Sequence, residues 1–163
     1  MKRIRVIVRL LLCITFCSYA LGEEKKNLNI VFIGNSITQG ALLEDPRHDA
    51  PPVKAALYLR KQPTGGTVRY SNQGVSGSTT LDFLPQNESL FPKVVQVADQ
   101  FRDETWATLI FSIMLGTNDS AITGPNGAPV SPSDYYGNMK SIVDRLLALY
   151  PGCKIVLHRP VWY

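Results

Sequence analysis

The chain has 163 residues and a formal net charge of +4, with 18% charged and 45% hydrophobic residues. Such a length suits a single domain. The first 22 residues carry four basic and no acidic side chains, so residues 23–163 have a net charge of +4 − 4 = 0. A neutral domain has no basic surface that would attract nucleic acid, and we expect no nucleic-acid partner.

Residues 1–22 have the pattern of a secretory signal peptide. Basic side chains fall within residues 2–9, an apolar run covers residues 10–16, and Ala20 and Gly22 are small residues where a signal peptidase reads the chain. The run is well short of the ~20 apolar residues that a membrane span needs. The pattern predicts export to the bacterial periplasm or medium, with no stable membrane association after cleavage.

The cysteines exclude two kinds of site. Cys13 and Cys17 lie in the signal segment, and neither follows the small residue that precedes a lipidated cysteine. Only Cys153 remains in residues 23–163. The domain therefore has neither an internal disulfide framework nor a cysteine-based metal site.

Strand and helix patterns alternate along residues 23–163. Continuous apolar runs bounded by Gly, Pro and Asn predict strands, and apolar residues at helical spacing predict helices. This alternation predicts an α/β fold, a three-layer α/β/α sandwich with a parallel sheet whose chemistry lies at the carboxyl ends of the strands. The expected strands cover residues 29–33, 67–71, 108–115 and 154–158, and the expected helices cover residues 51–62, 90–102 and 133–150.

Ser36 follows the first expected strand in the segment G-N-S-I-T. Gly34 allows a sharp turn there, which raises the serine hydroxyl at the mouth of the sheet as a candidate nucleophile. The alternative is that Ser36 only caps a short helix. The segment is not the G-x-S-x-G elbow of α/β-hydrolases, because Thr38 occupies the position of its last glycine.

Two further polar segments follow the second and third strands. Gly77 lies in N-Q-G-V-S-G-S-T, where its backbone N–H is a candidate hydrogen-bond donor. Asn118 lies in L-G-T-N-D-S, and its neutral amide can stabilise a developing oxyanion. The alternatives are that Gly77 is an ordinary turn glycine, and that Asn118 and Asp119 form a turn or an N-cap.

The order of these segments resembles that of the SGNH hydrolases, which are GDSL-like esterases and lipases. The resemblance covers residues 29 to about 159. It implies a flavodoxin-like fold, Ser36 as nucleophile, and an oxyanion hole formed by Ser36, Gly77 and Asn118, with no metal or cofactor. Asn35 replaces the Asp of the usual G-D-S, which leaves the nucleophile unchanged.

The resemblance also implies a D-x-x-H block near the C-terminus, which holds the catalytic histidine. His48 follows Asp45 at this spacing, but it lies after the first strand; it is interpreted as a solvated loop residue, with the role of catalytic base as the less favoured alternative. His158 ends the fourth strand and is interpreted as structural or pocket-lining. We therefore expect an inactive fragment that lacks the last strand, the last helix and the D-x-x-H block, with an unpaired sheet edge and an exposed apolar face.

The form of the first segment, together with predicted export, resembles bacterial SGNH proteins that deacetylate carbohydrates. The expected partner is a small-molecule or glycan ester, and sialate and xylan O-acetyl esters are the expected type. Two alternatives remain open. One is a lipid or thioester acyl hydrolase, and the other is a catalytically inactive SGNH-fold module that binds glycans.

Overall fold

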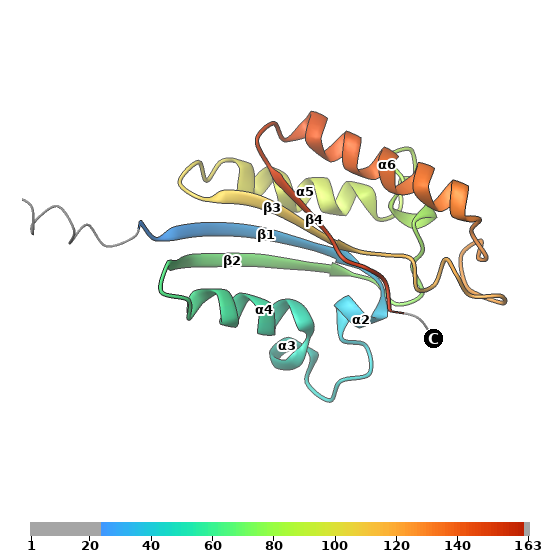
Figure 1. The fold of residues 1–163 in the computed structure, drawn as a ribbon, viewed down its shortest axis with the longest axis horizontal. Coiled ribbons are helices and arrows are strands. Elements are labelled where there is room, and N and C mark those ends of the chain that lie inside the picture. The colour runs from blue at the N-terminus through green and yellow to red at the C-terminus, as the bar shows by residue number, and fades with distance from the viewer. Residues whose placement is uncertain (1–23, 162–163) are drawn as a thin grey trace, which may run out of the picture.

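Four parallel strands form the sheet at the centre of the molecule (Figure 1). The structure is a computed structural model, and it describes residues 24–161. The predicted signal peptide, residues 1–22, lies outside the described residues. Among the described helices, none combines the length and apolar character required to cross a membrane.

The strands run in the order β2-β1-β3-β4 across the sheet. Gly34, the last residue of β1, pairs with Gly74 of β2 and with Met114 of β3, so these three strands end level with one another. Because all pairs are parallel, the loops that follow the strands share one edge of the sheet. The strands are β1 (Lys26–Gly34), β2 (Gly65–Gly74), β3 (Thr108–Met114) and β4 (Lys154–Leu157).

Helices cover both faces of the sheet, which confirms the predicted three-layer α/β/α fold (Figure 1). On one face lies α4 (Pro51–Arg60), with the short α2 (Ser36–Gln39) and α3 (Pro46–Asp49) beside it. On the other face lie α5 (Phe91–Arg102) and α6 (Pro132–Leu149). A single 3-10 turn, η1 (Leu81–Phe83), follows β2.

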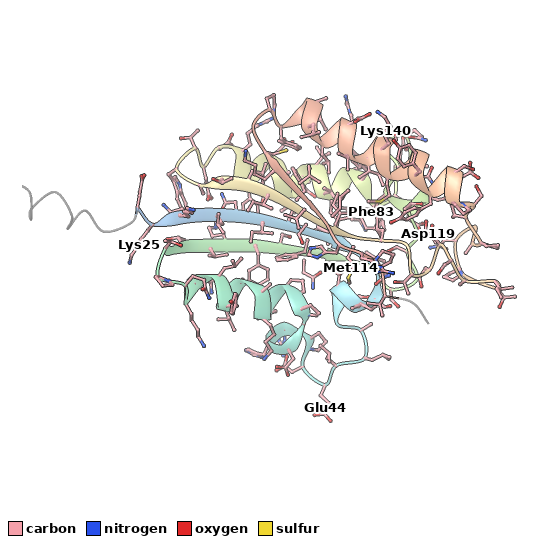
Figure 2. All side chains as sticks on the ribbon, in the orientation of Figure 1. Lys25, Glu44, Phe83, Met114, Asp119 and Lys140 are labelled. Atoms are coloured by element: carbon pink, nitrogen blue, oxygen red, sulfur yellow. The ribbon has the colours of Figure 1, made fainter. Side chains whose placement is uncertain are left out.

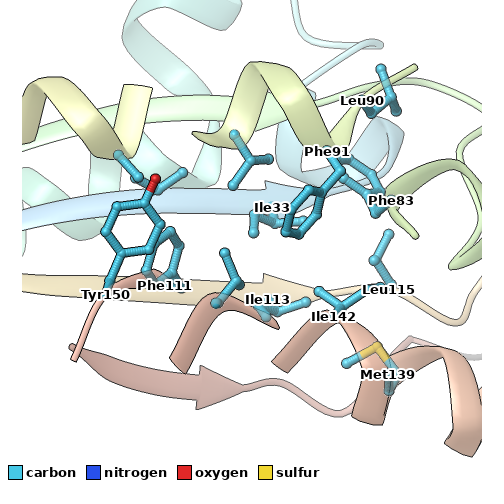
Figure 3. Packing of buried hydrophobic residues seen from close by; sticks show 14 of the residues in the cluster. Ile33, Phe83, Leu90, Phe91, Phe111, Ile113, Leu115, Met139, Ile142 and Tyr150 are labelled. Carbon is cyan, nitrogen blue, oxygen red and sulfur yellow. The ribbon is translucent and has the colours of Figure 1, made fainter. Parts of the chain in front are cut away.

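The larger hydrophobic core lies between the sheet and the pair α5 and α6 (Figure 3). Its buried strand residues come from β1 and β3, the two central strands of the described sheet. Ile142 on α6 and Val94 on α5 are fully buried against them. The cluster includes Val31, Ile33, Phe83, Val94, Ala98, Phe111, Ile113, Ile142, Leu146 and Tyr150.

A smaller core lies under α4, where Ile30 and Val68 of the sheet pack against Ala56. The edge strand β4 has one neighbour, β3, in the described part of the chain. Val156 and Leu157 on β4 are 43% and 57% exposed. The structure therefore has the exposed apolar surface at a sheet edge that we expected.

Every predicted strand and long helix is present, and each ends within three residues of its predicted position. The helices α3 and η1 were not predicted, and α2 was expected only in the alternative that Ser36 caps a short helix, because elements of three or four residues are too short to show hydrophobic periodicity. Local caps form α2 instead. The Asn35 side chain accepts a hydrogen bond from the Ile37 N–H, and Gly40 ends the helix in the left-handed conformation, with φ of 78°.

Candidate active site

Three loops meet at the carboxyl edge of the sheet, and each carries one residue of the predicted site. Ser36 follows β1, Gly77 follows β2 and Asn118 follows β3. Since β1 lies between β2 and β3, these loops are neighbours in space. Figure 2 labels Met114 and Asp119 at this edge.

Ser36 is the first residue of α2, and its side chain is not the helix cap. Asn35 occupies the capping position, with its Oδ1 3.0 Å from the Ile37 nitrogen. The capping alternative for Ser36 is therefore wrong, and its hydroxyl is not used for that purpose. Ser36 is half-buried and lines a groove of about 340 Å³, whose other lining residues are Ile37, Gly40, Ala41, Leu42, Leu43 and Pro51.

Close packing at Gly34 positions α2 and Ser36. A Cβ atom on Gly34 would lie 2.1 Å from the Thr38 hydroxyl and 2.9 Å from the Met114 carbonyl oxygen. A side chain at this position would push the helix away from the strand end. The Asn72 side chain on β2 donates a 2.9 Å hydrogen bond to the Thr38 carbonyl, and this bond holds α2 against the end of β2.

Gly77 has φ of 79°, in the left-handed region that favours glycine. A Cβ atom here would meet only Pro125, at 3.6 Å, so the backbone conformation rather than lack of space accounts for the glycine. Within residues 24–161, no hydrogen bond uses the backbone N–H of Gly77 or of Ser36. Both residues are half-buried, so these two N–H groups are free to donate to a ligand at the sheet edge.

Asn118 is buried, with 7% of its surface exposed. Its side-chain nitrogen donates a 2.8 Å hydrogen bond to the Ser78 carbonyl. An amide nitrogen carries two hydrogens, so a second donor remains. The turn alternative is correct for the backbone, since the Ala121 N–H donates to the Asn118 carbonyl at 3.1 Å, but neither Asn118 nor Asp119 caps a helix.

Ser78 connects all three loops, and the sequence analysis did not identify it. Its hydroxyl lies 3.2 Å from the Gly34 carbonyl and 2.8 Å from that of Val75, and its own carbonyl accepts from Asn118. A small polar residue between a glycine and a threonine carries no distinctive signal. Only the pairing of partners 40 and 44 positions apart identifies this role.

Asp119 and Thr80 form a second buried connection between the loops after β2 and β3. Asp119 is 2% exposed, and its Oδ1 accepts from the Thr80 backbone N–H at 3.0 Å and from the Thr80 hydroxyl. Burial, with the nearby Asp119 carboxyl as a smaller cause, raises the pKa of Tyr135 above its usual value. The Tyr135 phenol therefore stays neutral and donates to the Leu115 carbonyl at 3.1 Å.

Neither histidine hydrogen-bonds Ser36 in the described part of the chain. His48 is exposed and pairs with Asp45 at 2.7 Å, and the hydrogen bond from this ring lowers the pKa of Asp45. The expectation that His48 is solvated is confirmed, but the residue lies in the short helix α3 and not in a loop. The Nε2 of His158 lies 2.7 Å from the Ser112 hydroxyl, and both line a pocket of about 170 Å³ on the α4 side, so His158 is pocket-lining as expected.

The described residues include no candidate metal site. Within residues 24–161, no set of three His, Cys, Asp or Glu side chains lies close enough together to hold an ion. The chemistry that the site offers is a serine hydroxyl, two backbone N–H donors and one amide donor. Such a set suits acyl transfer, in which an attacked carbonyl oxygen gains negative charge.

The family model described as "GDSL-like Lipase/Acylhydrolase family" matches residues 32–163. The chain belongs to this family. No curated protein matches the chain. The match includes all three segments of the site, and it confirms the resemblance to SGNH hydrolases.

Several solved structures share the fold of this family member. A catalytic mutant of an acetylxylan esterase from Geobacillus stearothermophilus has a TM-score of 0.54 at 21% identity, over 85% of this chain and 62% of that protein. A carbohydrate acetylesterase from Sinorhizobium meliloti has a TM-score of 0.54 at 19% identity, over 80% of this chain and 63% of that protein. A mutant of the esterase AlinE4 has a TM-score of 0.52 at 23% identity, over 81% of this chain and 58% of that protein. The chain thus spans about three fifths of the length of these structures.

Proposed function

We propose that this family member is a serine ester hydrolase that removes O-acetyl groups from carbohydrates. The observation that carries the proposal is the position of Ser36 at one sheet edge with three free donors. These are the backbone N–H groups of Ser36 and Gly77 and the second amide hydrogen of Asn118. Donors fixed in advance around the position of a developing charge are usually the largest contribution to catalysis of this kind.

In the proposed reaction, the Ser36 oxygen attacks the ester carbonyl carbon while a base takes the hydroxyl proton. The carbonyl oxygen becomes an oxyanion, which the three donors bind. The bond to the alcohol oxygen then breaks, and the alcohol leaves with the proton. Water releases the acyl group from Ser36 by the same steps. The SGNH pattern assigns the role of base to a histidine of a D-x-x-H block. Neither His48, which pairs with Asp45, nor His158, which pairs with Ser112, contacts Ser36 in the described residues.

The choice of a carbohydrate ester rests on the structural neighbours and on the predicted export. Two of these neighbours are described as an acetylxylan esterase and a carbohydrate acetylesterase. An exported enzyme of this kind would meet acetylated polysaccharides outside the cell. The acetyl group itself is small, and only the space next to Ser36 is needed to hold it.

One observation favours a second candidate, a lipid or thioester acyl hydrolase. The groove beside Ser36 has a volume of about 340 Å³ and is lined by apolar residues. Leu42 is fully exposed and Leu43 is 41% exposed, both on this groove. Exposed apolar side chains next to a nucleophile would suit an acyl chain longer than acetate.

The test compares the full-length protein with its Ser36→Ala variant on acetylated xylo-oligosaccharides and on p-nitrophenyl esters from acetate to octanoate. We expect hydrolysis that is strongest for acetate and falls at least ~1000-fold in Ser36→Ala, because the covalent step is lost. Ser89→Ala, an exposed serine before α5, is the matched control and should retain full activity.

Each other result selects a different function. Full activity in Ser36→Ala would exclude this serine as the nucleophile. A maximum at butyrate or octanoate would favour the acyl hydrolase. Calorimetric binding of acetylated glycan without turnover by the wild-type protein would favour the inactive glycan-binding module.

A further inference from the structure

Buried hydrogen bonds join the loop that carries Gly77 to the loop that carries Asn118. One runs from the Asn118 amide to the Ser78 carbonyl, at 2.8 Å. A second runs from the Thr80 backbone N–H to Asp119 Oδ1, at 3.0 Å, and the Thr80 hydroxyl donates to the same oxygen. The two loops are therefore joined at Ser78 and at Thr80, one and three residues after Gly77 with its free donor.

Asp119 is unusual among these partners because it is a buried carboxylate. It is 2% exposed, and Thr80 is fully buried. Hydrogen bonds to a carboxylate are roughly twice as strong as those between neutral groups, but removing the charge from water is costly. Within residues 24–161, Asp119 Oδ2 has no hydrogen-bond partner, so the side chain is committed to Thr80 alone. A simple turn would need no such residue.

The orientation of the Thr80 hydroxyl is also set by α6. Asn138 donates its side-chain N–H to Thr80 Oγ1 at 2.9 Å, and this hydroxyl in turn donates to Asp119. Both sides of the hydroxyl are thereby used, which leaves it one orientation. The connection extends from α6 through Thr80 to Asp119, and from there along the backbone to Asn118.

We propose that Asp119 is a positioning residue of the oxyanion hole. By holding the backbone of Thr80, it fixes the short segment from Gly77 to Thr80 against the turn that carries Asn118. The Gly77 N–H and the second Asn118 hydrogen then converge on one substrate oxygen. This inference rests on the proposed function, because it assigns a role in the same site. Small displacements of such donors are sufficient to cause large losses of rate.

The proposal differs from a purely structural role in what it predicts for the kinetics. Oxyanion donors bind the transition state more strongly than the ester, so their displacement lowers kcat and leaves KM nearly unchanged. A residue that only stabilises the fold would change the unfolding midpoint without this kinetic pattern. Replacing such a residue would also not raise amide hydrogen exchange in the Gly77 loop selectively.

The experiment uses the full-length protein with Asp119→Ala, Asp119→Asn and Thr80→Val. We measure kcat and KM for p-nitrophenyl acetate, and amide hydrogen exchange in residues 76–81. For Asp119→Ala we expect kcat to fall 10- to 100-fold with KM within twofold, and exchange in residues 76–81 to rise at least tenfold. Asp119→Asn keeps an acceptor for the Thr80 N–H but loses the charge, and should fall between wild type and Asp119→Ala.

Thr80→Val retains the backbone hydrogen bond and should have a smaller effect than Asp119→Ala. If Asp119→Ala does not fold, Thr80→Val and Asp119→Asn provide the same measurements. The matched control is Asp144→Asn, which removes an exposed carboxylate that pairs with Lys140 on α6. We expect it to change neither kcat nor the exchange of residues 76–81.

Each result leads to a distinct conclusion. Unchanged exchange in the Asp119 variants would overturn the inference, whatever their activity. Faster exchange with unchanged kcat in an active protein would overturn it as well, since the loop would then move without effect on catalysis. Absence of turnover in the wild-type protein would instead refute the proposed function. In that case, exchange alone decides whether Asp119 holds the Gly77 loop.

Discussion

Replacing Asn118 with alanine removes two hydrogen bonds that the structure and the proposal assign to one side chain. The first is the 2.8 Å bond to the Ser78 carbonyl. Ser78 is 1% exposed, so its carbonyl would be left buried without this donor. The second is the bond from the remaining amide hydrogen to the oxyanion of the substrate.

The two losses differ in size and in the measurement that detects them. An unsatisfied buried acceptor costs about 1–3 kcal/mol of folding stability. Loss of one oxyanion donor costs about 2.7–4 kcal/mol of transition-state stabilisation, which corresponds to a fall in kcat of about 100- to 1000-fold. We therefore expect Asn118→Ala to lower both the free energy of unfolding and kcat, with little change in KM.

Urea unfolding measures the first effect, and steady-state hydrolysis of p-nitrophenyl acetate by the full-length protein measures the second. Asn87→Ala is the control in the loop before α5, because it removes a similar 3.1 Å bond from the Asn87 amide to the Leu81 carbonyl, together with the 3.0 Å bond that Asn87 Oδ1 accepts from the exposed Ser89 N–H. We expect it to lose about 1 kcal/mol of stability and to keep its kcat. A kcat within threefold of wild type in a less stable Asn118→Ala would refute the oxyanion role. An unchanged free energy of unfolding would refute the reasoning from the Ser78 carbonyl.

Two further predictions concern stability. Ile142→Ala should lower the free energy of unfolding by about 2–5 kcal/mol, since this fully buried side chain leaves a cavity between α6 and the sheet; Leu147→Ala, 44% exposed on the same helix, should lose far less in the same urea titration. Burial, and then the hydrogen bond to Asp99, raises the pKa of Tyr150 in the folded protein. Below about pH 10, Tyr150 keeps its proton in both the folded and the unfolded chain, and its full contribution to the free energy of unfolding is present. This contribution is lost as the pH rises further. Tyr150→Phe should lose about 1 kcal/mol near neutral pH but decline less than wild type at alkaline pH, and equal declines in both proteins would contradict this assignment.

The regular elements were predictable because each is specified by residues that are close in sequence. On α6, Ile142 and Leu146 recur at helical spacing, and they are buried because that spacing places them on one face. The β1 segment is a short apolar run that fits a strand covered on both faces. The cap of α2 was not predicted correctly, because the sequence analysis considered only Ser36 for that position. Only the observed backbone shows that Asn35 caps the helix.

The connections around the site could not be predicted from the sequence. Ser78 meets Asn118 across 40 positions, and Thr80 meets Asp119 across 39 positions. These contacts depend on the parallel register that brings the ends of β2, β1 and β3 level. No local pattern indicates which polar side chain of one loop will face which backbone group of another.

The sequence by itself therefore determined the fold class, the order of the elements, the family and the three segments that form the candidate site. The tertiary structure decided how these segments are used. It placed free N–H donors at Ser36 and Gly77, committed one hydrogen of Asn118 to Ser78, and buried Asp119 between the loops. The physical reason is the sequence separation over which each interaction acts. Hydrophobic periodicity and turn preferences act over a few residues, whereas the hydrogen bonds of the site join loops that only the assembled sheet brings together.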